Sequence, residues 1–170
     1  MTMENNMSIT ISPIGVVHSS LTDADGAPIQ PVFAEASKAV VEVYEPYREG
    51  LKDLEGFERI WLIYWFHKAT QSTLLVKPYL DTSERGLFST RAPCRPNPIG
   101  ISAVRLLSIE DGRIHVADVD ILDGSPLLDI KPYVSRFDCY EVKRNGWIDE
   151  VRDSRGIADG RFCDRDKAGD

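Results

Sequence analysis

The sequence of 170 residues has little cysteine, little histidine and no long apolar run, and each shortage argues against a class of protein. Its three cysteines, Cys94, Cys139 and Cys163, are odd in number and share no close spacing. That pattern argues against a disulfide framework and against a zinc knuckle. The three histidines stand far apart, without a pair at metal-ligand spacing. No metal site is therefore expected.

Signals for a membrane or for secretion are missing as well. The sequence contains no run of about 18 apolar residues, so we expect no membrane span. Its start, "MTMENNMSITIS", has no basic segment followed by a long apolar one, and we expect no signal peptide. Together with the few cysteines, this predicts a cytoplasmic protein.

Positive charge is in short supply, and it is unevenly spread. The net charge of −7 means that the overall field does not attract nucleic acid. Residues 85–105, however, contain four arginines and no Asp or Glu. This cluster is either a solvated loop or an anion site inside an acidic protein, and charge alone favours the solvated loop.

Short runs rich in β-branched and aromatic residues dominate what is present. They predict strands over Ile9–Ser19, Ala39–Tyr44, Arg59–Phe66, Thr73–Leu80, Ile101–Ile109, Arg113–Leu122 and Leu127–Val134. Glu110-Asp111-Gly112 predicts a tight hairpin, and a β-bulge is expected near Asp118. Only Glu45–Phe57 shows a short helical pattern.

This pattern predicts an all-β fold, mainly an antiparallel β-barrel with short helices. The chain is long enough for one domain with a sizeable core, which we expect over residues 8–147. Residues 148–170 are rich in charge of both signs and poor in large apolar side chains, so they predict a loosely ordered tail.

The stretch from Ser89 to Gly100, "STRAPCRPNPIG", interleaves three prolines with Arg91 and Arg95. Each proline fixes its own φ and biases the preceding residue toward extended geometry. The loop is therefore stiff and presents both arginines at nearly fixed angles. Preorganisation of this kind lowers the entropy cost of meeting a ligand, although rigid proline turns also simply connect strands.

Four motifs, in matching order from about Ile11 to Pro132, resemble the TsaA-like (TrmO) family. They are "SPIGVVHSS", "GLKDLEGFERIWLIYWFHK", "LFSTRAPCRPNPIGIS" and "LDGSPLLDIKPYV". The resemblance implies an S-adenosylmethionine-dependent methyltransferase that acts on N6 of threonylcarbamoyl-adenosine beside the anticodon of tRNA. It also implies a small β-barrel that works as a homodimer and not a Rossmann-type enzyme, in keeping with the lack of a G-x-G-x-x-G motif.

The resemblance also implies where the cofactor binds. The implied residues are Pro28, Ile29, Gln30, His67, Lys68, Arg91, Ile101, Ala117, Asp118, Val119 and Asp120. Ile29 stands where tRNA-acting members of the family have arginine.

Chemistry suggests roles for some of these side chains. Arg91 suits the methionine carboxylate, and Asp118 or Asp120 would accept hydrogen bonds from ribose hydroxyls or from the methionine ammonium. For the general base, Asp123 is a weak candidate, because an aspartate there more often initiates a turn. Arg95 is predicted to point outward to a tRNA phosphate; the alternative is that it pairs with a neighbouring carboxylate and locks the loop.

Two other functions remain open from the sequence. One is a methyltransferase with the same pocket that acts on a small metabolite or a protein, which the acidic charge and Ile29 support. The other is a non-catalytic S-adenosylmethionine-binding module.

Overall fold

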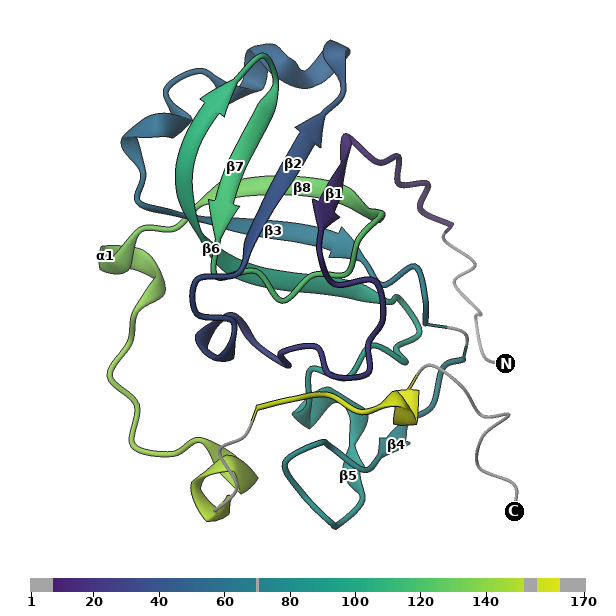
Figure 1. Cartoon of the computed structure of the whole chain (residues 1–170). Coiled ribbons are helices and arrows are strands. Elements are labelled where there is room, and N and C mark those ends of the chain that lie inside the picture. Colours follow the sequence, from purple (N-terminus) through teal and green to yellow (C-terminus); the bar gives the residue numbers. More distant parts are fainter. Residues whose placement is uncertain (1–7, 70, 152–155, 163–170) are drawn as a thin grey trace, which may run out of the picture.

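Six antiparallel strands close into a barrel in the order β1-β2-β7-β6-β3-β8 (Figure 1). The computed structural model describes residues 8–69, 71–151 and 156–162. The barrel strands are β1 (Gly15–Ser19), β2 (Lys38–Val43), β3 (Arg59–Trp65), β6 (Ile99–Glu110), β7 (Arg113–Ala117) and β8 (Ser125–Pro132). The predicted antiparallel β-barrel is thus confirmed, and the fold is not of the Rossmann type.

The barrel interior is a packed apolar core. On β3, Ile60, Leu62 and Tyr64 are buried, while the residues between them are only half-buried. The other strands alternate similarly, as the two-residue period of a strand requires. Side chains from all six strands therefore fill the interior, as in other small barrels.

The predicted hairpin between β6 and β7 is confirmed. Asp111 and Gly112 form its two-residue loop, with φ of 48° and 78°. Positive φ at both central residues gives the turn whose twist matches that of the flanking strands.

Three strand predictions are wrong in extent. The strand expected from Ile9 begins only at Gly15. Within Thr73–Leu80 only β4 (Leu75–Val76) is a strand, and it pairs with β5 (Arg85–Gly86) outside the barrel. Pro78 lacks the N–H that a longer pairing would need. The strand expected to run to Leu122 ends instead at Ala117.

The bulge expected near Asp118 is also misplaced. Asp118 lies beyond β7 with φ of 61°, and its N–H donates to the carbonyl of Ser37 at 2.8 Å. The register shift lies on the neighbouring strand β6, between Leu106 and Ser108.

The helical elements are all short. The segment Glu45–Phe57 divides into the 3₁₀ helices η2 (Glu45–Leu51) and η3 (Leu54–Gly56), with Asp53 at φ of 66° between them. The remaining elements are η1 (Pro31–Phe33), η4 (Leu87–Ser89), α1 (Ser135–Asp138), η5 (Gly146–Glu150) and η6 (Gly160–Phe162). Among the described residues, no helix has the length and apolar character that a membrane crossing requires.

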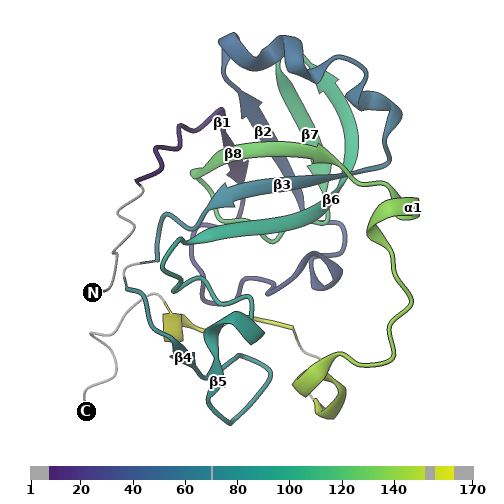
Figure 2. The ribbon, with the colours of Figure 1, turned by 180° about the vertical axis from the view of Figure 1, so that it is seen from behind.

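Residues 156–162, which we call the C-terminal strap, lie between the β1–β2 loop and the β4–β5 hairpin (Figure 2). Ile157 bridges Pro28, and the N–H of Ala158 donates to the carbonyl of Ala27 at 2.7 Å. The ring of Phe162 meets that of Tyr79 edge-on, with centroids 4.9 Å apart. This part of the predicted tail thus packs on the barrel domain, while the domain boundary at residue 147 stays a prediction.

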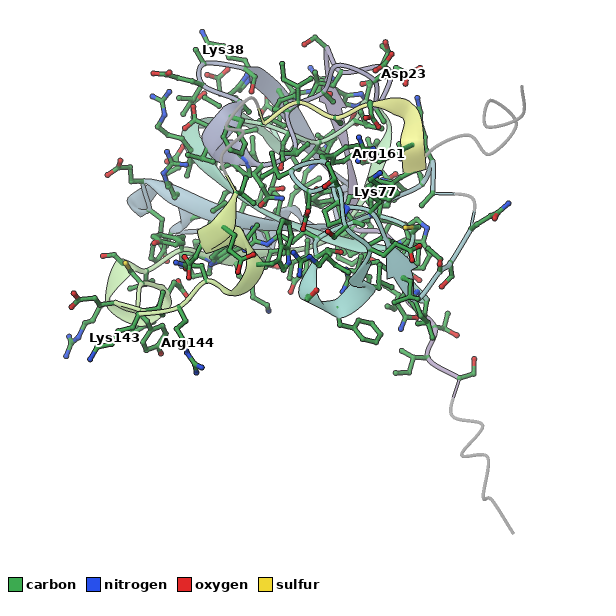
Figure 3. All side chains as sticks on the ribbon, turned by 90° about the horizontal axis from the view of Figure 1, so that it is seen from below. Asp23, Lys38, Lys77, Lys143, Arg144 and Arg161 are labelled. Atoms are coloured by element: carbon green, nitrogen blue, oxygen red, sulfur yellow. The ribbon has the colours of Figure 1, made fainter. Side chains whose placement is uncertain are left out.

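One side chain fastens the end of the strap. Arg161 donates to the carbonyl of Pro78 at 2.9 Å and lies close to Lys77 (Figure 3). Its guanidinium also pairs with Asp159 and stacks on Tyr79, 5.2 Å from the ring centroid. The strap therefore has polar anchors as well as apolar ones.

Candidate active site

A pocket of about 250 Å³ lies where β3 ends and β6 and β8 begin. Its walls come from the β1–β2 loop, the proline-rich loop, the segment after β7 and Ala158 of the strap. Most of the predicted site residues meet here: Pro28, Ile29, Gln30, His67, Lys68, Arg91, Arg95, Ile101 and Asp120. Segments from distant parts of the sequence thus build one hollow.

Arg91 is held at the rim by Gln30. Its Nη1 donates to Oε1 of Gln30, and the side chain is otherwise exposed. The same two residues line two further hollows that adjoin the pocket. A guanidinium fixed in this way offers a planar fork to an anionic group.

A buried polar chain leads from the core to the pocket. The hydroxyl of Ser102 donates to Oδ1 of Asp120 at 2.6 Å, and the hydroxyl of Tyr64 lies 3.3 Å from Oγ of Ser102. Because the proton of Ser102 points to Asp120, the hydroxyl of Tyr64 is the donor in the second bond. Burial raises the pKa of Asp120 to about 6, against the lowering effect of the hydrogen bond from Ser102. Burial likewise raises the pKa of Tyr64, so its hydroxyl stays protonated.

The polar pair after β3 takes its position from backbone and serine partners. Nδ1 of His67 lies 3.2 Å from Oγ of the buried Ser125, and Nζ of Lys68 donates to the carbonyl of Thr22. Burial lowers the pKa of His67, and the neighbouring charge of Lys68 lowers it further. The imidazole is therefore biased toward its neutral form.

The "PNPIG" motif is tied to β3 at one position and requires glycine at another. The N–H of Phe66 donates to the carbonyl of Pro98 at 2.7 Å, which ties the loop to the end of β3. A Cβ on Gly100 would lie 2.4 Å from Cζ of Tyr64, so only glycine leaves room for the Tyr64 ring to pack against the backbone of β6.

Arg95 locks the loop from within. Its Nη1 donates to the carbonyls of Thr90 at 3.0 Å and of Ala92 at 3.5 Å, and its guanidinium lies 5.7 Å from the ring centroid of Phe88. In the described structure its hydrogen-bond partners are carbonyls, not the carboxylate that one alternative expected. Contact with a tRNA phosphate stays a prediction.

Three residues assigned to the cofactor lie outside this pocket. Ala117 and Val119 are buried, at 1% exposure each. Asp118 faces the other way, where it pairs with Arg59 at 2.8 Å and Arg105 at 3.5 Å. Burial alone would raise the pKa of Asp118, but the hydrogen bonds from both arginines hold it below its usual value. Of the two aspartates proposed as acceptors, only Asp120 reaches the pocket.

Asp123, the candidate base, has a structural task. Its Oδ1 accepts the N–H of Ser19 at 3.1 Å, and its own N–H donates to the carbonyl of Leu21. It is not among the residues that line the pocket. This is the turn-forming role that its sequence position favours.

Sequence reasoning missed Tyr64, Ser102 and Ser125, which supply hydroxyls inside or beside the pocket. One signal was available for Tyr64: it falls in the buried phase of β3 with Ile60 and Leu62, and a buried tyrosine hydroxyl needs a partner. The serines carried no such signal.

The donor set fits an adenosylated amino acid. Arg91 offers a cation for a carboxylate, Asp120 offers an acceptor for hydroxyl or ammonium groups, and Pro28, Phe66 and Leu122 offer apolar walls for a base. No group of His, Cys, Asp and Glu side chains within the described ranges could hold a metal ion.

These features define a small, closed β-barrel protein with a ligand pocket at one end of the barrel. The chain belongs to the family of the tRNA-methyltransferase O N-terminal domain, whose family model matches residues 16–139.

Similar proteins come from archaea, bacteria and mammals. A probable S-adenosyl-L-methionine-binding protein of Pyrococcus abyssi is 48% identical over 158 residues, which are 92% of this chain and 86% of the relative. The tRNA (adenine(37)-N6)-methyltransferase of Mus musculus is 34% identical over 77% of this chain and 32% of its own length. The crystal structure of TrmO from Pseudomonas aeruginosa matches with a TM-score of 0.70 at 39% identity, over 82% of this chain and 62% of that one. The chain thus spans less than two thirds of the solved relative.

Proposed function

We propose that this protein is an S-adenosylmethionine-dependent methyltransferase that methylates N6 of an adenine next to the anticodon of tRNA. The observation that carries the proposal is that Gln30, Arg91 and Asp120 line one pocket. His67 and Lys68 line the same pocket. The family contains proteins named for this activity as well as proteins named for cofactor binding.

The residues of the pocket divide the binding of the cofactor between them. Arg91 binds the methionine carboxylate through its planar fork, and Gln30 keeps the fork in place. Asp120 accepts hydrogen bonds from the polar part of the same molecule. Pro28, Phe66 and Leu122 exclude water from its apolar faces.

When bound, S-adenosylmethionine supplies an electrophilic methyl carbon on a sulfonium. The protein's main task is then to place the attacking amine in line with that carbon, which can account for much of the rate. An adenine in an anticodon loop is unpaired, so its base can enter a pocket without melting a duplex.

The amine must also lose a proton. Asp120 replaces Asp123 as the candidate acceptor, because it lines the pocket and its pKa of about 6 leaves it mostly ionised at neutral pH. The hydroxyls of Ser102 and Tyr64 support that carboxylate from the core side.

A second candidate function is cofactor binding without transfer, which the name of the Pyrococcus abyssi relative favours. A third, transfer to a small metabolite or a protein, rests on the net charge of −7 and on Ile29.

One experiment separates the three. The protein is incubated with methyl-labelled S-adenosylmethionine and total cellular tRNA, protein and metabolite fractions, and the tRNA is digested to nucleosides. Label in a methylated adenosine supports the proposal. Label in another fraction supports transfer to another substrate, and bound cofactor without transfer supports the binding module.

A further inference from the structure

A second hollow, which we call the aromatic groove, opens directly beside the pocket. Its volume is about 590 Å³, more than twice that of the pocket. The two share Ile29, Gln30, Tyr79, Thr90 and Arg91 along their common edge. A molecule that enters the pocket from this side therefore lies partly in the groove.

Aromatic rings line the groove. They come from Phe33, Tyr79, Phe88, Trp147 and Phe162. Phe88 is 75% exposed, so its ring is accessible to a ligand in the groove.

A hydrogen bond and cation–π contacts hold three of these rings in place. Nε1 of Trp147 donates to the carbonyl of Ser89 at 2.9 Å, which fixes the indole beside η4. Guanidinium groups stack on three of the rings: Arg85 on Trp147 and Arg95 on Phe88, both at 5.7 Å from the centroid, and Arg161 on Tyr79 at 5.2 Å. The rings are thus preorganised, which lowers the entropy cost of binding.

The described residues that line the groove carry positive charge and no negative charge. Among these described residues Arg91 is the charged one, in a chain of net charge −7. An acid close by is Asp149, which accepts two hydrogen bonds from Asn145 at the edge of the groove, each of 2.8 Å. Lys143 and Arg144, two exposed cations on the segment that leads into the groove at Asn145, project outward (Figure 3). An occupant with flat apolar faces and negative charge fits this surface.

We propose that the aromatic groove binds an unpaired base of the RNA substrate, the neighbour of the adenine that enters the pocket. This inference rests on the proposed function and adds a base-stacking subsite to it. Aromatic side chains accept any base through its π face, and arginine beside them suits the phosphates that link two nucleotides. Phe88 in η4 lines the groove, and Arg91, three residues further on, lies on the edge shared with the pocket, so adjacent nucleotides would meet adjacent parts of one surface.

The test compares variants of Phe88 in binding to a tRNA anticodon stem-loop with adenine directly 3′ of the anticodon. Phe88→Ala and Phe88→Leu remove the flat ring, and Phe88→Tyr keeps it. We expect the first two to weaken RNA binding about tenfold and the third to bind as the wild type. Tyr140→Ala is the matched control, because Tyr140 is 78% exposed on a nearby segment but does not line the groove.

Two further measurements make the outcomes distinct. Cofactor affinity, measured by calorimetry, is expected to be unchanged in all four variants, which shows that the protein is folded. RNA binding by Phe88→Leu equal to wild type would overturn the inference while leaving the proposed function intact. Wild-type protein that does not bind the stem-loop would overturn both. Light scattering that shows a loss of dimers in Phe88→Ala, in step with the loss of RNA binding, would assign the groove to a second copy of the chain and also overturn the inference.

Discussion

Arg91 and Gln30, 61 positions apart in the sequence, are joined by a hydrogen bond from Nη1 to Oε1 at the point where the pocket and its two adjoining hollows meet. The bond gives a solvent-exposed guanidinium a fixed direction. It also links the β1–β2 loop to the proline-rich loop, and residues of both loops line the same pocket.

Arg91→Lys should lower the affinity for S-adenosylmethionine by about tenfold. Lysine keeps the charge but loses the planar fork, which is worth about one charge-assisted hydrogen bond. Isothermal calorimetry measures the change, and a thermal melt shows whether the variant is folded. Unchanged affinity would remove Arg91 from the cofactor site.

Asp120 should make stability and activity depend on pH in opposite directions. Its pKa of about 6 lies above the ordinary 3.8, so the native state binds the proton more tightly than the unfolded chain does. The stabilisation is fully present below about pH 4 and is lost as the pH rises through about 6, by about 3 kcal/mol at most. Methyl transfer should rise over the same range, because the proton acceptor becomes ionised.

Asp120→Asn tests both slopes. In the variant, the unfolding free energy measured by denaturant titration should no longer fall between about pH 4 and about pH 8 through this group. The kcat of the variant should drop strongly while the protein remains folded. Asp129→Asn is the control, since Asp129 lies outside the pocket and pairs with Lys131 at 2.8 Å. Equal pH profiles for wild type and Asp120→Asn would contradict the assignment.

Gly156→Ala should loosen the C-terminal strap. Because Ala158 of the strap lines the pocket, this should also weaken cofactor binding several-fold. Gly156 has φ of 61°, which costs about 1 kcal/mol for alanine. Its added Cβ would also lie 2.2 Å from Cγ of Phe33. Limited proteolysis and calorimetry measure the two effects. Gly50→Ala is the control, because a Cβ added at Gly50 would meet no described residue beyond its chain neighbours within 4 Å.

The homodimer remains a prediction, and the outer face of β3 and β6 is where we propose to test it. Ile63 and Ile101 are cross-strand partners on the outer face of β3 and β6, and Ile101 is 46% exposed. Light scattering should give twice the 19.1 kDa of one chain. Ile63→Glu should reduce this to one chain, whereas Leu75→Glu, at a 59% exposed site outside the barrel, should not. A wild-type mass of one chain would refute the prediction.

Local chemistry determined a large part of this protein. The alternation of β3, the two-residue turn at Asp111 and Gly112, and the stiffness of the proline-rich loop all follow from the residues within each segment. The resemblance carried by the motifs in that loop and before His67 also pointed to most of the residues that line the pocket, because family motifs carry position as well as residue type.

Tertiary structure decided which of the predicted side chains can work together. Asp118 and Asp120 look alike in sequence, yet Asp118 turns to Arg59 and Arg105, which the β3–β6 register places opposite each other. Asp120 turns to Ser102 on a neighbouring segment, and burial there changes its acidity. These differences depend on barrel closure and strand register, which bring distant residues into contact and set how much water each one keeps; no local pattern contains that information.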